Sequence, residues 1–191
     1  MTDPELALIH AFARGEDAAF VTLYRTYRDR MVGYCTRLLG DQARAEEAAQ
    51  EVFLKLYRAR TSYEERGHFG TFLYRIATNH CFNLRAQLDQ RLVERKYGLD
   101  EAAHAAGHDP SSLLANDELR AAISSALSDL PDKQRAAFVL VHHQGLAYRD
   151  AAGALDVSES AVKSLIHRAR ETMMRRLGAY VSEPSEVEHA V

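Results

Sequence analysis

The chain has 191 residues, a length that suits either one compact domain or two small ones. Hydrophobic residues make up 47% of it and charged residues 27%, which predicts a packed globular protein and excludes wholesale disorder. No apolar run reaches eighteen residues, and Asp3 and Glu5 stand where a secretory signal would carry basic residues. We therefore expect a cytoplasmic protein without membrane insertion.

The net charge of -3 hides charges that are segregated along the chain. Residues 163–176 carry five basic side chains and one acidic one, whereas residues 100–118 carry five acidic side chains and no lysine or arginine. The basic segment is suited to nucleic-acid phosphates, and the acidic segment would repel them.

Three segments of the first half place apolar residues at three- and four-residue intervals, the pattern of amphipathic helices. They cover residues 18–39, ended by Gly40, then about 43–59 and about 71–88. Cys35 and Cys81 fall on apolar faces, which predicts buried thiols, because a zinc site would need four suitably spaced ligands. The three helices together can enclose one core.

Two stretches interrupt this periodicity. Residues 61–70 are polar and contain two glycines, which predicts a loop before the third helix. After Arg91 the apolar period fades into an Ala-rich acidic segment with glycine and proline, which predicts a linker at residues 92–114.

Helical periodicity returns from Asn116, and no strand-like alternation occurs anywhere in the sequence. One helix should stop before Pro131, which then occupies the first turn of the next helix, and Gly145 should form a left-handed cap after that helix. We predict an all-α fold of two small helical domains joined by an acidic linker. The expected divisions are residues 1–91, a linker at 92–114, a second domain at 115–178 and a disordered tail at 179–191.

Residues 146–178 fit a helix-turn-helix, two helices joined by a tight turn. Ala152 is small enough for the helices to cross closely, and Asp156 stands where the turn needs a left-handed residue. Ser158 is expected to cap the second helix, whose free face is basic. Such a helix can enter the major groove of DNA, although a basic solvated face on a packing helix is the alternative interpretation.

The sequence lacks the usual catalytic motifs. It has no H-E-x-x-H pair, no phosphate-binding glycine loop, no G-x-S-x-G elbow and no cysteine in a polar setting. We expect no catalytic, cofactor or metal site and no enzymatic activity.

The chain resembles the ECF-type (extracytoplasmic function) sigma factors of bacterial RNA polymerase at two separate places. Residues 41–58 read DQARAEEAAQEVFLKLYR and residues 69–79 read FGTFLYRIATN, and both resemble sigma region two. The segment that starts at Leu130-Pro131, with GLAY at 145–148 and VKSLIHRAR at 162–170, resembles sigma region four. The resemblance implies a factor that directs RNA polymerase to specific promoters and assists promoter melting in transcription initiation.

The resemblance also implies partners and residue roles. The expected partners are core RNA polymerase, through its clamp helices and flap, promoter DNA, and an anti-sigma factor of the kind that members commonly have. The positions that match the polymerase-binding surface are Glu47, Gln50, Glu51 and Leu54.

Promoter contacts are implied at both regions. The minus-ten element, as a single strand, would meet Tyr63, Arg66, His68, Phe69, Asn79 and Asn83, with Arg75 and Arg85 on backbone phosphates. The minus-thirty-five element would take Lys163, Ser164, His167 and Arg168 in its major groove, with Arg149 and Arg170 on phosphates. Tyr57 and Phe72 stand where the family often has tryptophan.

Two other interpretations stay open from the residues alone. The same helix-turn-helix ends many stand-alone transcriptional regulators, in which an N-terminal helical domain senses a signal or dimerises. A protein-binding helical adaptor is the third possibility.

Overall fold

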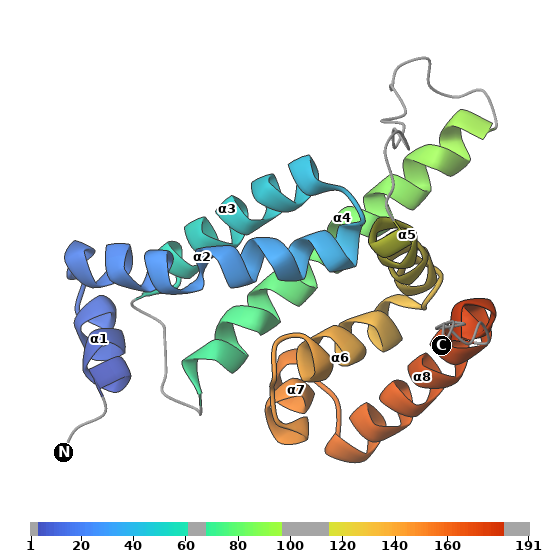
Figure 1. Ribbon diagram of the computed structural model, residues 1–191. Helices are drawn as coiled ribbons and strands as arrows, with labels where there is room; N and C mark the ends of the chain where they lie inside the picture. The colour runs from blue at the N-terminus through green and yellow to red at the C-terminus, as the bar shows by residue number, and fades with distance from the viewer. Residues whose placement is uncertain (1–3, 61–67, 97–114, 182–191) are drawn as a thin grey trace, which may run out of the picture.

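The computed structural model describes residues 4–60, 68–96 and 115–181, and in these ranges every regular element is a helix, as predicted (Figure 1). The helices are α1 (Pro4–Ala13), α2 (Asp17–Leu39), α3 (Gln42–Arg58), α4 (Phe69–Lys96), α5 (Ala115–Ser128), α6 (Asp132–His142), α7 (Tyr148–Leu155) and α8 (Glu159–Val181).

The first bundle is built from α2, α3 and α4. Gly40 ends α2 with a left-handed φ of 74°, and the Asp41 carboxylate then caps α3 by accepting from the Arg44 N–H at 2.9 Å. Cys35 and Cys81 are both fully buried, which confirms that these thiols belong to the core. Helix α2 therefore ends, and α3 begins, where the sequence supplies a cap.

Helix α1 was not predicted from the sequence. Its Ile9 and Phe12 are buried against α2, and the Phe12 and Phe20 rings stack at 5.9 Å. The Tyr27 hydroxyl donates to the Glu5 carboxylate and so ties α1 to the middle of α2. Burial and this carboxylate raise the pKa of Tyr27.

Helix α4 is longer than predicted, because it continues through Lys96 rather than ending near Leu88. The loss of apolar periodicity reflects the loss of a buried face and not the end of the helix, since Leu92 and Val93 are exposed. Residues 87–96 contain no glycine or proline and consist mostly of good helix formers. The first five residues of the expected linker are therefore helical, and its residues 97–114 lie outside the described part of the chain.

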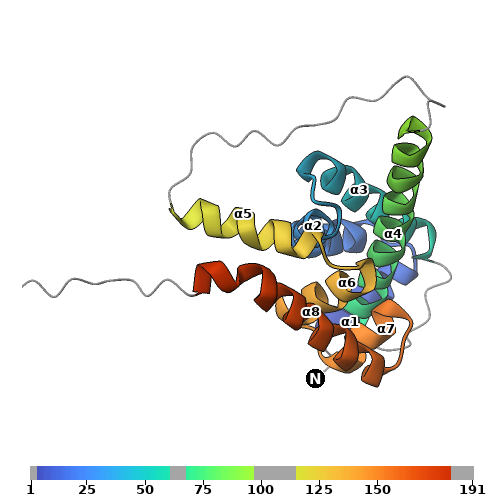
Figure 2. The same cartoon turned by 90° about the vertical axis from the view of Figure 1, so that its right-hand side faces the viewer.

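Helices α5 to α8 form a second bundle that packs against the first (Figures 1 and 2). Helix α7 lies on α4, and α5 and α6 lie at the C-terminal end of α2. The Tyr74 hydroxyl donates to Gln144 across this boundary at 2.7 Å, and burial raises the Tyr74 pKa to about 12. At Gly153 the backbone approaches Thr71 so closely that a Cβ would lie 3.0 Å from its methyl carbon.

Arg135 is buried at this boundary, with 1% of its surface exposed. Its guanidinium donates to the carbonyl of Leu38 in the first bundle at 2.8 Å. It also donates to the carbonyls of Leu127 and Ser128 at the end of α5 and of Leu130 in the turn before α6, at 2.6 to 2.7 Å. Burial lowers the pKa of Arg135 to about 10, yet the group stays charged at neutral pH. The four hydrogen bonds that the guanidinium donates to carbonyl oxygens compensate for its desolvation.

Candidate nucleic-acid interface

The turn between α7 and α8 has the geometry of a helix-turn-helix. Asp156 takes the left-handed conformation, with φ and ψ both 52°, and the Val157 N–H bonds back to the Ala152 carbonyl at 3.1 Å. The Ser158 hydroxyl accepts from the Ala161 N–H at 3.2 Å and caps α8. Ala152 is buried at the crossing. These four observations confirm the turn expected from the sequence.

The free face of α8 is exposed where the sequence analysis expected it. Val162, Ile166 and Ala169 point into the second bundle and are almost completely buried. The opposite positions are all exposed and carry Lys163, Ser164, His167, Arg168 and Arg170. Arg149 on α7 is exposed as well. Helix α8 packs on α5, α6 and α7 through its buried side (Figure 2). Its other side is exposed to solvent, so a duplex can reach it.

Two of these cations have partners within the chain. Lys163 pairs with Glu159 one turn earlier, at 3.0 Å, and its ammonium lies 5.9 Å from the centre of the Tyr148 ring. Arg170 donates toward His142 Nε2 at 3.2 Å, and burial followed by this guanidinium lowers the His142 pKa. Both contacts are exposed to solvent, so breaking them to form contacts with DNA costs little free energy.

A second candidate surface is a groove of about 350 Å³ between α3 and α4. It contains Asn79, Asn83 and Arg75, three of the residues expected at the minus-ten element. Phe72 and Ile76 supply an apolar floor, and the Arg75 guanidinium lies 5.4 Å from the Phe72 ring. Amides, a cation and an aromatic face are the groups that bind unstacked nucleobases.

The same groove is lined by Lys55 and His80, two residues that no motif in the sequence singles out. Lys55 Nζ lies 2.8 Å from His80 Nδ1, and burial followed by Lys55 lowers the pKa of His80. A neutral His80 accepts this bond and fixes the ammonium at the groove. The two residues are 25 positions apart on different helices, so no local pattern could reveal the pair.

The remaining residues expected at the minus-ten element are less uniformly placed. Tyr63 and Arg66 lie outside the described residues. His68 is exposed beside the start of α4, but Phe69 is buried with its ring 5.5 Å from that of Tyr27. Phe69 thus packs in the core and is not presented to a ligand here. Arg85 faces the second bundle, where its Nε lies 2.7 Å from Asp132 Oδ1.

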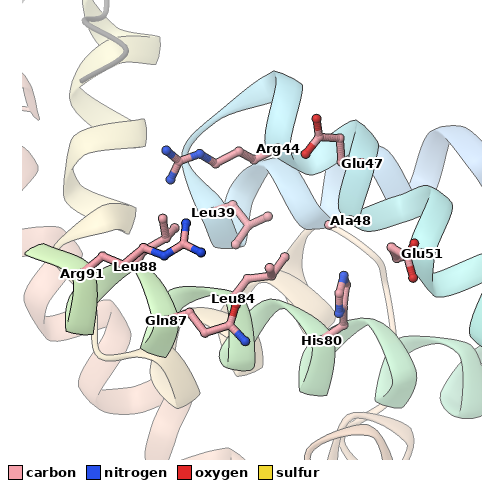
Figure 3. Close-up of a pocket in the computed structure, with 10 residues that line it drawn as sticks. All are labelled: Leu39, Arg44, Glu47, Ala48, Glu51, His80, Leu84, Gln87, Leu88 and Arg91. Atoms are coloured by element: carbon pink, nitrogen blue, oxygen red, sulfur yellow. The ribbon is translucent and has the colours of Figure 1, made fainter. Parts of the chain in front are cut away.

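The residues expected to bind polymerase lie together on α3 and are all exposed. Glu47 and Glu51 line a groove of about 290 Å³ between α3 and α4, whose other wall includes Leu84 and Leu88 (Figure 3). Gln50 and Leu54 continue the same exposed side of α3, and Leu54 is 45% exposed. The four α3 positions are acidic and partly apolar, which suits a basic helical partner, whereas the groove is also lined by Arg44 and Arg91.

Among the described residues, no group of three or more histidine, cysteine or acidic side chains is placed to hold a metal ion. None of the described helices is long and apolar enough to cross a bilayer.

Comparisons with known proteins cover both bundles. Residues 23–91 match the sigma-70 region 2 family and residues 120–173 match the sigma-70 region 4 family. The chain is similar to the RNA polymerase sigma-H factor of Pseudomonas aeruginosa, with 30% identity over 92% of this chain and 95% of that one. It is also 30% identical to the ECF RNA polymerase sigma factor SigW of Bacillus subtilis, over 86% of this chain and 91% of the relative.

Solved structures share the fold. CnrH, in complex with the cytosolic domain of CnrY, superposes with a TM-score of 0.69 at 21% identity, over 93% of this chain and 99% of CnrH. The sigma factor RpoE of Bartonella quintana, in complex with the anti-sigma factor NepR, gives a TM-score of 0.65 at 22% identity, over 83% and 96% of the two chains. The two family matches and the relatives of similar length agree, and the chain belongs to the ECF family of RNA polymerase sigma factors.

Proposed function

We propose that the chain divides promoter recognition between its two bundles while core polymerase supplies all catalysis. The first bundle, to about residue 91, binds polymerase and the melted minus-ten strand. The second, from about residue 115, binds the minus-thirty-five duplex through α8. The main support for this proposal is the exposed basic face of α8. The left-handed turn at Asp156 and the Ser158 cap fix the start of this helix.

On this proposal Lys163, Ser164, His167 and Arg168 meet base edges, and Arg149 and Arg170 meet phosphates. All six residues are exposed, and five of them share the α8 side opposite its buried Val162, Ile166 and Ala169, as major-groove recognition requires. The groove with Asn79 and Asn83 takes a base of the separated strand, and Lys55 joins Arg75 as a backbone contact.

The polymerase surface is assigned to α3, with Glu47, Gln50, Glu51 and Leu54 facing a clamp helix. An anti-sigma factor is a further expected partner, because the sigma factor RpoE of Bartonella quintana, which has the same fold, was solved in complex with the anti-sigma factor NepR. The protein acts in the cytoplasm, where polymerase and promoter are found.

Reconstitution of the holoenzyme tests this function. Core polymerase with the purified chain should bind a subset of genomic fragments and give run-off transcripts from them, whereas core alone should not. The chain alone should bind the same fragments weakly. Strong sequence-specific binding by the isolated chain, with no transcript from the holoenzyme, would instead support a stand-alone regulator.

A further inference from the structure

Helices α3 and α4 hold a cation and a histidine in contact at the groove assigned to the minus-ten strand. Lys55 Nζ lies 2.8 Å from His80 Nδ1, and the contact is partly buried. Both residues line the groove together with Asn79, which is proposed to meet a base. An ammonium can only donate, so His80 Nδ1 accepts this hydrogen bond and the ring is neutral in the free chain.

The charges around His80 come from both helices. Burial, followed by Lys55 on α3, lowers the pKa of His80, whereas Glu51 on α3 raises it less. Figure 3 shows the His80 ring pointing from α4 toward α3, the helix that carries Glu51. On α4, Arg75 lines the same groove as Lys55. The neighbouring groove, which His80 also lines, contains the charged residues Arg44, Glu47, Glu51 and Arg91. The balance of burial and charge therefore favours a neutral imidazole in the free chain.

A strand phosphate in this groove competes with His80 for the Lys55 ammonium. The bond from Lys55 to a phosphate oxygen joins two opposite charges, whereas the bond to His80 joins a charge to a neutral ring. The phosphate charge also favours the protonated form of a nearby histidine. When the strand binds, Nδ1 of His80 is released from the ammonium and takes up one proton from solvent. The imidazolium then adds a second positive charge beside the backbone.

Proton uptake on binding fixes the direction of a pH effect. If the strand raises the pKa of His80, protonation of His80 raises the affinity for the strand by the same factor, because the two equilibria are linked. An ordinary histidine titrates near pH 6.5, and the pKa of His80 is lowered from that value in the free chain. The affinity for the strand should therefore increase as the pH falls from about 7.5 to 5.5.

We propose that His80 is a positioning residue for the minus-ten strand, which holds the Lys55 ammonium in the groove of the free chain and takes up a proton when a strand phosphate draws that ammonium away. The inference rests on the proposed function of this groove in binding the separated strand. It adds a regulation that the proposed function does not include, since strand binding becomes more favourable at acidic pH.

The test measures binding of a labelled single-stranded oligonucleotide to reconstituted holoenzyme at several pH values. The oligonucleotide carries the minus-ten sequence of a promoter that the holoenzyme transcribes. His80→Asn places an amide oxygen near the position of Nδ1, so the variant still accepts from Lys55 but does not titrate. The two proteins should bind alike at pH 7.5, and the wild type should gain about three- to tenfold over the variant by pH 5.5, since one pKa unit corresponds to tenfold.

Two further variants separate positioning from a general effect of a lost histidine. His80→Leu removes the acceptor and should bind the strand more weakly than His80→Asn at pH 7.5. His142→Gln is the matched control, because His142 also contacts a cation, Arg170, but lies in the second bundle. This control should keep the wild-type pH profile for the minus-ten strand.

An NMR titration of the full chain measures the pKa of His80 directly. This pKa should lie below 6.5 in the free chain and rise when the oligonucleotide binds, while that of His142 should not respond. An unchanged His80 pKa on a bound strand, or equal pH profiles for the wild type and a folded His80→Asn variant, would overturn the inference. Asn79→Ala with Asn83→Ala tests the groove itself. Wild-type binding by that double variant contradicts the proposed function, whereas weaker binding without a His80 effect contradicts only this inference.

Discussion

Lys163 and Arg168 lie on the exposed face of α8, but their surroundings differ. Lys163 is already paired with Glu159, whereas Arg168 is exposed one and a half turns further along. A residue that reads a base edge costs ~1–3 kcal/mol of binding when removed and relaxes preference at one promoter position, whereas a phosphate contact weakens every promoter alike.

We predict that Lys163→Ala and Arg168→Ala each reduce holoenzyme binding to the best promoter by that amount. Binding to a panel of minus-thirty-five variants at fixed salt shows which of the two contacts each residue makes. Arg175→Ala, also exposed on α8, is the control and should leave binding nearly unchanged. Equal binding by all three variants and the wild type would remove α8 from promoter recognition.

Asp156 is the only non-glycine residue with positive φ in the described ranges, which makes its backbone the strained point of the helix-turn-helix. We predict that Asp156→Val lowers the free energy of unfolding by about 1–2 kcal/mol, because a β-branched side chain is disfavoured in the left-handed region. Asp156→Gly should be tolerated, since glycine adopts that region freely. Urea denaturation of the two variants measures the difference, and similar stabilities would show that the turn is not held in this conformation.

Individual residues could be predicted where the chemistry is local. The Asp156 turn, the Ser158 cap and the exposed face of α8 each follow from a few adjacent residues. Lys55 and Arg135 could not be predicted in this way. Their partners lie 25 and 97 positions away, and both residues look like ordinary surface cations in the sequence.

At the scale of the helices, periodicity gave the existence of seven elements but not all of their ends. The apolar period of α4 ends where the helices packed against it end. The helix itself continues through Lys96, because the residues there have a high intrinsic helix propensity. Helix α1 could not be predicted from periodicity, because among its residues with described side chains, 5–13, only Ile9 and Phe12 are buried, too few to establish a period.

The contact of α7 with α4 depends on the absence of a side chain at Gly153. Alanine favours a helix over glycine by about 1 kcal/mol, but here its Cβ would lie 3.0 Å from the Thr71 methyl carbon. We predict that Gly153→Ala stabilises the protein less in the wild type than in a Thr71→Ala background, where the methyl is absent. Thermal unfolding of the two single variants and the double variant measures this coupling, and equal gains in both backgrounds would show that α7 and α4 do not touch here.

At the scale of the whole molecule, three histidines make stability depend on pH. Burial and then a nearby cation lower the pKa of His80, His142 and His143 below the ordinary 6.5, the cations being Lys55, Arg170 and Arg37. As the pH falls, the unfolded chain therefore protonates these three histidines at a higher pH than the folded chain does. The free energy of unfolding therefore has its full value above pH 6.5, where the histidines are neutral in both states, and it decreases as the pH falls below 6.5.

We predict that the free energy of unfolding falls as the pH is lowered from 7 to 5, most visibly through the half-buried His80. His80→Gln should flatten this dependence, because the lowered pKa of His80 is then removed. Urea titrations across this range provide the measurement, and an unfolding free energy that rises toward pH 5 would contradict the assignment.

The packing of one bundle on the other could not be predicted from the sequence. In the sequence, Tyr74 and Gln144 are equally compatible with an exposed surface and with a boundary between bundles. A predicted linker does not reveal whether the two units that it joins are in contact. The division into two bundles follows from two separate apolar periods, whereas their contact depends on shape and on a few polar partners.

The most direct test of the divided recognition is a promoter library randomised separately at the two elements and transcribed by reconstituted holoenzyme. We predict that Lys163→Ala with Arg168→Ala alters base preference only at the minus-thirty-five element, and that Asn79→Ala with Asn83→Ala alters it only at the minus-ten element. Changes by either pair at both elements, or at neither, would contradict the account.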